Sequence, residues 1–151
     1  RHSLSERGLA YRDKAQRDSE NYVGDALARQ GYRTVQNPTG GANPPLTPER
    51  MRAEGLKETK DPDLLIEDRI FDTYTPEKDD AGSVRDGIER KIQAGQTHRV
   101  VVDLRHTTQT ETSVRAALRA DPVEGLREVI IVTEEGVGQP FRPLTRPMTI
   151  P

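Results

Sequence analysis

Apolar residues recur at helical spacing near the start of the chain. Residues 4–30 predict a helix, and in its second half Val23, Ala26 and Leu27 fall on one stripe. Gly31 follows directly and is a typical helix stop. The pattern therefore predicts a long helix whose second half packs on a core.

Short apolar runs later in the chain predict strands. Residues 32–36 form one, and a hairpin follows with the strands LLIE at 64–67 and RIFDTY at 69–74. The runs RVVVDL at 99–104 and EVIIVT at 128–133 have apolar centres without alternation, which is typical of strands buried on both faces. Two such strands joined by a helix indicate a parallel, right-handed crossover.

Two more helices lie between these strands. One covers residues 83–94, with Val84, Ile88 and Ile92 at i, i+4 and i+8, and the other lies near 112–119. The order is then helix, strand, hairpin, helix, strand, helix, strand. This order predicts an α/β sandwich with a mixed sheet.

A Pro/Gly-rich stretch interrupts this order at residues 37–61, and Thr47-Pro48 within it suits the start of one short helix. A connection of this length in a small domain is either functional or disordered. We therefore expect either a substrate-contacting flap or a flexible insertion. The Pro-rich end, residues 136–151, adds at most one edge strand.

Composition narrows the functional classes. The 151 residues suffice for one domain, and 32% hydrophobic against 32% charged residues limits the core to the segments above. The net charge of −2 argues against a strongly basic nucleic-acid wrapper, although a nuclease needs only a positive cleft. The sequence has no cysteine, no signal-peptide pattern and no apolar run near the roughly 18 residues of a membrane span. Because it begins without methionine, we interpret it as the C-terminal part of a longer protein.

The hairpin has an aspartate at each end. If Glu67-Asp68 is the two-residue turn, counting outward places Asp63 directly opposite Asp72, roughly 5 Å apart at Cβ. Like charges at this distance destabilise a sheet, and a divalent cation held by oxygen ligands would compensate them. The alternative is that both aspartates lie at a frayed hairpin end and face water.

Two further charged residues stand where apolar ones are expected. Lys91 lies three residues after Ile88, at the edge of a core-facing stripe, and Glu20 lies three residues before Val23. Either residue alone would more often be a rim residue. Together with the aspartates, they form the set that metal-assisted phosphodiester hydrolysis needs, with Mg²⁺, Mn²⁺ or Zn²⁺ as the cofactor.

Three blocks of sequence resemble a known family. The blocks ENYVGDALARQGY (20–32), PDLLIEDRIFDTYTP (62–76) and SVRDGIERKIQAGQTHRVVVDL (83–104) are similar to the C-terminal tRNA-nuclease domains of bacterial contact-dependent growth inhibition toxins and related polymorphic toxins. The resemblance covers about residues 18–135, and its blocks occur in the family's order. It implies a secreted or cell-surface bacterial toxin whose C-terminal fragment acts in the cytoplasm of a target cell.

Some of these toxins have the PD-(D/E)XK nuclease fold, with a helix-first αβββαβ core. The resemblance then implies that Glu20, Asp63 and Asp72 are catalytic and bind the metal. Tyr74 stands where the simplest motif has its lysine, so that Lys91 would have to supply the catalytic amine from the following helix.

The segment from Gln96 to Arg99 leaves a second mechanism open. Gln96, Thr97, His98 and Arg99 either contact RNA phosphates or form an ordinary helix-to-strand connection. They also suit a metal-independent ribonuclease of the barnase and colicin type, with His98 as general base and Lys91 and Arg99 stabilising the charge on phosphorus.

We therefore expect residues 1–17 to be an entry or linker segment and residues 18–151 to be a nuclease toxin domain. The expected activity is endonucleolytic cleavage of RNA, specifically tRNA, by metal-assisted hydrolysis. The expected partner is a cognate immunity protein, and the domain is expected to be monomeric apart from that complex. The alternatives are the metal-independent ribonuclease, a DNase on the same scaffold, and a non-enzymatic binding module.

Overall fold

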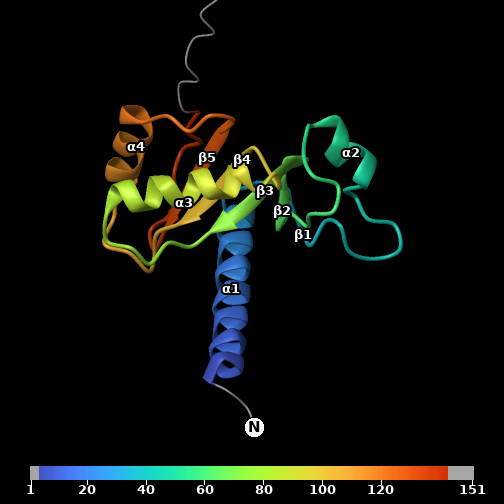
Figure 1. Ribbon diagram of the computed structural model, residues 1–151, viewed down its shortest axis with the longest axis horizontal. Helices are drawn as coiled ribbons and strands as arrows, with labels where there is room; N and C mark the ends of the chain where they lie inside the picture. The colour runs from blue at the N-terminus through green and yellow to red at the C-terminus, as the bar shows by residue number, and fades with distance from the viewer. Residues whose placement is uncertain (1–3, 143–151) are drawn as a thin grey trace, which may run out of the picture.

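A mixed sheet lies between two layers of helices (Figure 1). The computed structural model describes the backbone of residues 4–142 and the side chains of residue 14 and residues 16–142. The helices are α1 (Leu4–Arg29), α2 (Pro48–Ala53), α3 (Ala81–Gln93) and α4 (Glu111–Ala120). The strands are β1 (Thr34–Gln36), β2 (Leu64–Ile66), β3 (Arg69–Tyr74), β4 (Arg99–Asp103), β5 (Glu128–Thr133) and β6 (Gly136–Val137). The predicted helix-first, mixed-sheet α/β sandwich is confirmed.

The strands follow one another in the sheet in chain order, β1 to β6. The pairs β3–β4 and β4–β5 are parallel, and the three outer pairs are antiparallel. Both parallel connections contain a helix, α3 or α4, and the parallel pairing predicted for β4 and β5 is confirmed. The two edge strands are only three and two residues long, so that neither edge offers a long template for pairing.

Separate apolar clusters cover the two faces of the sheet. Helices α3 and α4 bury Val84, Ile88 and Leu118 against one face, whereas α1 buries Val23 and Leu27 against the other. The central strand β4 alternates between the clusters, because Val100 and Val102 belong to the first and Val101 to the second. The continuous apolar runs therefore reflect burial on both faces.

The hairpin turn falls where the register predicted it. Leu64 pairs with Phe71 and Ile66 with Arg69, which leaves Glu67-Asp68 as the turn. Both turn residues have positive φ, at 48° and 65°, as a type I′ turn requires.

The Pro/Gly-rich stretch folds over the hairpin. Thr47 Oγ1 accepts a hydrogen bond from the Arg50 amide at 3.2 Å, which caps α2 as predicted. Met51 and Leu56 pack with Leu65 and Ile70 in a third apolar cluster. The stretch is thus a packed cover on the hairpin, and its contact with a substrate stays a prediction.

The remaining boundaries shift by a few residues. The predicted strand at 32–36 begins only at Thr34, because the Tyr32 amide donates to the Leu27 carbonyl and thereby closes α1. Helix α3 begins two residues early, because Asp80 caps it through the Ser83 amide. The predicted edge strand corresponds to β6, while residues 143–151 of that tail lie outside the described residues.

Helix α1 is continuous across the expected boundary between residues 17 and 18. Residues 1–3 of the expected entry segment lie outside the described residues, and the boundary itself stays a prediction. Among the described residues, no helix combines the length and the apolar character needed to cross a membrane.

Candidate active site

Asp63 and Asp72 meet at the open end of the hairpin. The Asp63 amide donates to Asp72 Oδ1 at 3.1 Å, and the Thr73 amide donates to Asp63 Oδ2 at 2.8 Å. The Asp72 residue is only 1% exposed. The expectation that both aspartates face water is therefore wrong for Asp72, and the predicted juxtaposition of the two is confirmed.

Burial raises the pKa of both carboxyls. The pKa of Asp72 rises from 3.8 to about 6, first because of burial and then because of the neighbouring Asp63 charge, while Lys91 acts in the opposite direction. The pKa of Asp63 likewise rises to about 6, mainly through burial, and the nearby Glu20 adds to the rise. The aspartate pair therefore becomes fully charged only above the ordinary range of carboxyls.

Within the described residues, two side chains, Lys91 and Gln96, donate to the Asp72 carboxylate. Lys91 Nζ lies 3.4 Å from Asp72 Oδ2, and Gln96 Nε2 donates to Asp72 Oδ1 at 2.7 Å. Gln96 also donates to the Asp61 carbonyl at 3.3 Å. Helix α3 thus presents the Lys91 amine to the aspartate pair, as its position at the edge of the apolar stripe suggested.

Asp72 and Asp63 each line a hollow on the surface. The first hollow is lined by Asp72, Tyr74, Gly87, Arg90, Lys91, Ala94 and Gln96. The second is lined by Glu20, Gln36, Asn37, Asp61, Pro62 and Asp63. Glu20 comes from α1, which covers the other face of the sheet, and its carboxyl interacts with that of Asp63.

This arrangement fits a divalent cation only in part. Two adjacent carboxylates, one buried and one partly buried, suit Mg²⁺, which proteins hold through one or two carboxylates together with water and substrate phosphate. In the part of the chain that the structure describes, no three His, Cys, Asp or Glu side chains converge closely enough to hold a metal. Glu20, Asp63 and Asp72 therefore form a row instead of the three-ligand cage that the sequence suggested.

Helix α1 is held beside this row by a buried polar contact. Ser19, the residue before Glu20, donates to Asp103 Oδ2 at 2.8 Å. Asp103 is fully buried and also accepts from Arg105 Nη2 at 2.9 Å, and the Arg105 guanidinium stacks on the Tyr22 ring at 3.6 Å. The position of Glu20 is therefore fixed by contacts one residue away in sequence.

The segment from Gln96 to Arg99 is engaged mainly within the protein. Thr97 is fully buried, and its hydroxyl lies 2.8 Å from the Ile70 carbonyl. His98 Nε2 lies 2.9 Å from the Glu54 carbonyl, and Arg99 lies beside Glu128. Gln96 is a direct partner of Asp72 instead of a group on the outer surface. An RNA contact by any of the four stays a prediction, and complete burial makes Thr97 the least accessible.

Two residues of the first hollow did not emerge from the sequence as site residues. Tyr74 lies two positions after Asp72 and so faces the same side of β3, and Arg90 precedes Lys91 on α3. A side chain at Gly87 would collide with the Tyr74 ring, so that this glycine makes room for the tyrosine. The i, i+2 spacing from Asp72 was the available signal for Tyr74.

The raised pKa values predict how stability depends on pH. Between about pH 4 and pH 6 the folded chain holds protons on Asp63 and Asp72 that the unfolded chain has released, so the stability due to these groups falls as pH rises through this window. The variant Asp72→Asn removes one of these two titrating groups. In metal-free buffer, the unfolding free energy of the variant should therefore increase relative to that of the wild type as pH rises. Above about pH 6 the variant should be the more stable protein.

Urea unfolding of both proteins at about pH 4.5 and about pH 7.5 measures this difference. The same difference in unfolding free energy at both pH values would show that Asp72 ionises normally in the folded chain.

Comparison with known proteins places the chain in a family. The family described as contact-dependent growth inhibition CdiA C-terminal domain has a model that matches residues 60–137, just over half of the 151 residues. The tRNA nuclease CdiA-2 of Burkholderia pseudomallei (strain 1026b) is 29% identical over 117 residues, which are 78% of this chain but 3% of that protein. The chain thus spans only a small part of that relative's length.

A solved structure has the same fold. The CdiA-CT/CdiI toxin and immunity complex from Burkholderia pseudomallei matches with a TM-score of 0.65 at 24% identity, over 95% of this chain and 90% of that one.

The residues that the family model matches include Asp63, Asp72 and Lys91, whereas Glu20 precedes them. This chain therefore belongs to the CdiA C-terminal domain family of contact-dependent growth inhibition proteins.

Proposed function

We propose that this chain is the endoribonuclease domain of a contact-dependent growth inhibition toxin and that it cleaves tRNA. The observation that carries the proposal is the aspartate pair, in which Asp72 is buried and lies 3.4 Å from the Lys91 amine. The name of the related protein, tRNA nuclease CdiA-2, supports tRNA as the substrate.

The proposed reaction is hydrolysis of a phosphodiester bond. The oxygen of a water molecule attacks phosphorus, the bond from phosphorus to a ribose oxygen breaks, and that oxygen takes up a proton. A divalent cation, when bound, supplies an activated water and neutralises charge on the phosphate. Asp63 and Asp72 are the proposed ligands, with Glu20 beside Asp63. Each of these two aspartates lines a hollow, which leaves room for a phosphate.

The other side chains of the first hollow orient these groups. Lys91 carries a positive charge next to Asp72, so it can bind the scissile phosphate or orient the attacking water. Gln96 donates to the Asp72 oxygen that also accepts from the Asp63 amide, which restricts rotation of that carboxylate. The arrangement is consistent with a PD-(D/E)XK-like site whose lysine has moved to the helix that follows the hairpin.

The geometry favours this mechanism over the metal-independent one. His98 Nε2 is engaged with the Glu54 carbonyl, and His98 does not line the hollow that contains Lys91. Thr97 is buried. A general base at His98 would have to leave its partner before it could act on a ribose hydroxyl.

The biological setting forms part of the proposal. The similar solved structure is a complex of a toxin with an immunity protein, which supports a cognate immunity protein as the partner of this chain. We infer delivery of this domain from a larger secreted or cell-surface protein into the cytoplasm of a target cell, where tRNA is accessible.

The test is incubation of the purified domain with total bacterial RNA and, separately, with plasmid DNA. We expect discrete tRNA fragments on a denaturing gel and intact DNA. Cleavage of DNA alone would replace the proposal with a DNase on the same scaffold. Cleavage of neither substrate would favour a binding module.

A further inference from the structure

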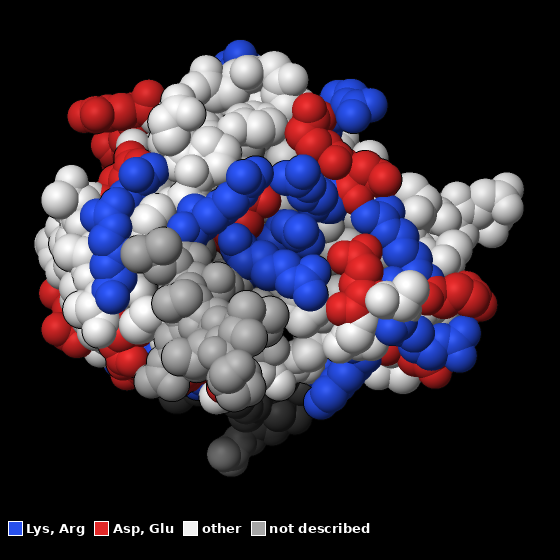
Figure 2. Space-filling view, turned by 90° about the horizontal axis from the view of Figure 1, so that it is seen from above, with Lys and Arg blue, Asp and Glu red and all other residues white. Residues whose placement is uncertain are grey.

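Three arginines stand side by side at one end of the sheet. Arg69 is the first residue of β3, Arg99 is the first residue of β4, and Arg127 directly precedes β5. Because these strands are parallel neighbours, their first residues lie at the same end, and Arg99 pairs with Glu128 in the register. Figure 2 shows Lys and Arg side chains gathered around a small acidic spot on this end of the molecule. We call Arg69, Arg99 and Arg127 the arginine patch.

The buried carboxylate of Glu128 lies near two of these arginines. Glu128 Oε1 lies 3.5 Å from Arg99 Nε and 3.6 Å from Arg69 Nη1, and the Glu128 side chain is only 7% exposed. Glu54 Oε1 lies 3.9 Å from Arg99 Nη1, but the same carboxylate also forms an ion pair with Arg50, whose Nε lies 3.1 Å from Glu54 Oε2. Within the described residues, Arg127 forms no ion pair. The patch therefore carries more positive than negative charge.

The excess charge is unfavourable in the free protein. Burial lowers the pKa of Arg99, and the neighbouring Arg127 and Arg69 lower it further by repulsion. Arg99 Nε is buried without a hydrogen-bond partner. In a chain with a net charge of −2, three adjacent guanidinium groups are not explained by general basicity. An anion bound across them would remove the repulsion.

We propose that the arginine patch binds the phosphate backbone of the RNA strand that the candidate active site cleaves. This proposal rests on the function proposed above. Planar guanidinium groups present paired N–H donors that match phosphate oxygens, and they bind any sequence because they touch only the backbone. Arg69 and Arg127, which the sequence did not single out, thereby join Arg99 in RNA binding.

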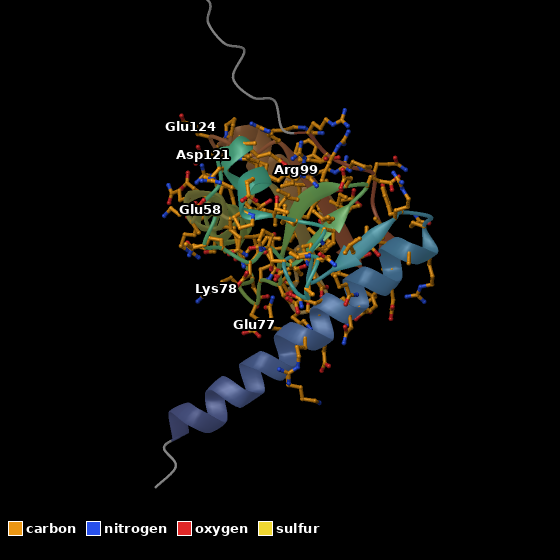
Figure 3. The ribbon with its side chains drawn as sticks, turned by 90° about the vertical axis from the view of Figure 1, so that its right-hand side faces the viewer. Glu58, Glu77, Lys78, Arg99, Asp121 and Glu124 are labelled. Carbon is orange, nitrogen blue, oxygen red and sulfur yellow. The ribbon has the colours of Figure 1, made fainter. Side chains whose placement is uncertain are left out.

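The location of the patch favours RNA over an acidic protein surface. Arg69 lies three residues before Asp72 on β3, a distance of about 10 Å at the usual rise per residue. Val100, the residue after Arg99, pairs with Asp72 in the sheet. Figure 3 shows Arg99 near the strands at the end of the molecule opposite the N-terminal half of α1. Because successive side chains alternate between the two faces of a strand, Arg69 leaves β3 on the face opposite to Asp72. An RNA strand bound beside Lys91 would therefore meet the patch by passing around this end of the sheet.

The test uses two exposed patch residues and one matched control. Binding of a labelled tRNA is measured on the inactive Asp72→Asn background, alone and with Arg69→Gln or Arg127→Gln. The control is Arg29→Gln, because Arg29 is an exposed arginine in a hollow that Glu134 and Glu135 line. Each patch variant should weaken binding by roughly 3- to 10-fold and reduce the slope of log K against log salt by ~0.7 to 0.9. Arg29→Gln should change neither quantity.

Cleavage by the otherwise wild-type protein is measured in parallel, so that the two proposals can fail separately. Suppose that both patch variants still cleave RNA, with unchanged tRNA affinity and an unchanged slope of log K against log salt. This result would overturn the proposed role of the patch and leave the proposed nuclease activity standing. Weaker binding to the immunity protein, with unchanged RNA binding, would also overturn it and assign the patch to protein docking. Arginine-dependent RNA binding without cleavage would support the patch and contradict the proposed nuclease activity.

Discussion

The variant Asp72→Asn is expected to lose RNA cleavage by roughly 10³-fold or more while remaining folded, because ligand and charge effects at a metal-assisted phosphoryl site amount to several kcal/mol. The substitution preserves the size of the side chain and an acceptor for the Asp63 amide and Gln96 Nε2. It removes the negative charge beside Lys91. Initial rates of tRNA cleavage at saturating protein measure the loss.

The hairpin itself offers the matched control. Asp68 lies in the turn between the same two strands, is exposed and pairs with Arg50 at 3.0 Å. Asp68→Asn keeps a residue type that tolerates positive φ, so it should cleave tRNA at the wild-type rate. Far-UV circular dichroism and thermal melting of both variants confirm folding. Wild-type cleavage by Asp72→Asn would remove the aspartate pair from the mechanism.

Removal of divalent cations with EDTA is expected to abolish RNA cleavage, and addition of excess Mg²⁺ or Mn²⁺ should restore it. The physical reason is that the pair brings a second carboxylate, Asp63, next to the buried Asp72, where Lys91 is the basic side chain that forms an ion pair with it. A bound cation should also stabilise the folded chain by ligand binding, and this increase in Tm should disappear in Asp72→Asn. Both the cleavage assay and the melting curves are therefore informative.

The opposite result points to a different set of residues. Cleavage that survives EDTA, with no effect of Mg²⁺ on melting, would contradict the metal mechanism. It would favour a metal-independent ribonuclease in which His98 and Lys91 act on the 2′-hydroxyl. The variant His98→Ala would then lose activity, whereas under the metal mechanism it should retain most of it.

Much of the fold was predictable because local rules determine it. The Glu67-Asp68 turn sets the register of β2 on β3, and a period-two strand then leaves Asp63 opposite Asp72. The apolar centres of β4 and β5 predicted burial on both faces, and the predicted cap at Thr47 acts within three residues. Each of these features depends on residues that are close together in the chain.

The details of the candidate site were decided by packing between distant segments. Gln96 reaches Asp72 across 24 positions, and Ser19 reaches Asp103 across 84, so neither contact follows from a local pattern. Glu20 approaches Asp63 from α1, which lies on the other face of the sheet from Lys91, and this approach likewise follows from no local pattern.

The sequence by itself thus determined the order of elements, the hairpin register and the pairing of the two aspartates. Only the tertiary structure decided that Thr97 is buried, that Gln96 holds Asp72, and that Arg69, Arg99 and Arg127 gather at one end of the sheet. The physical reason is that hydrophobic period and turn geometry act over a few residues. Contacts between side chains of different elements depend instead on how those elements cross in space.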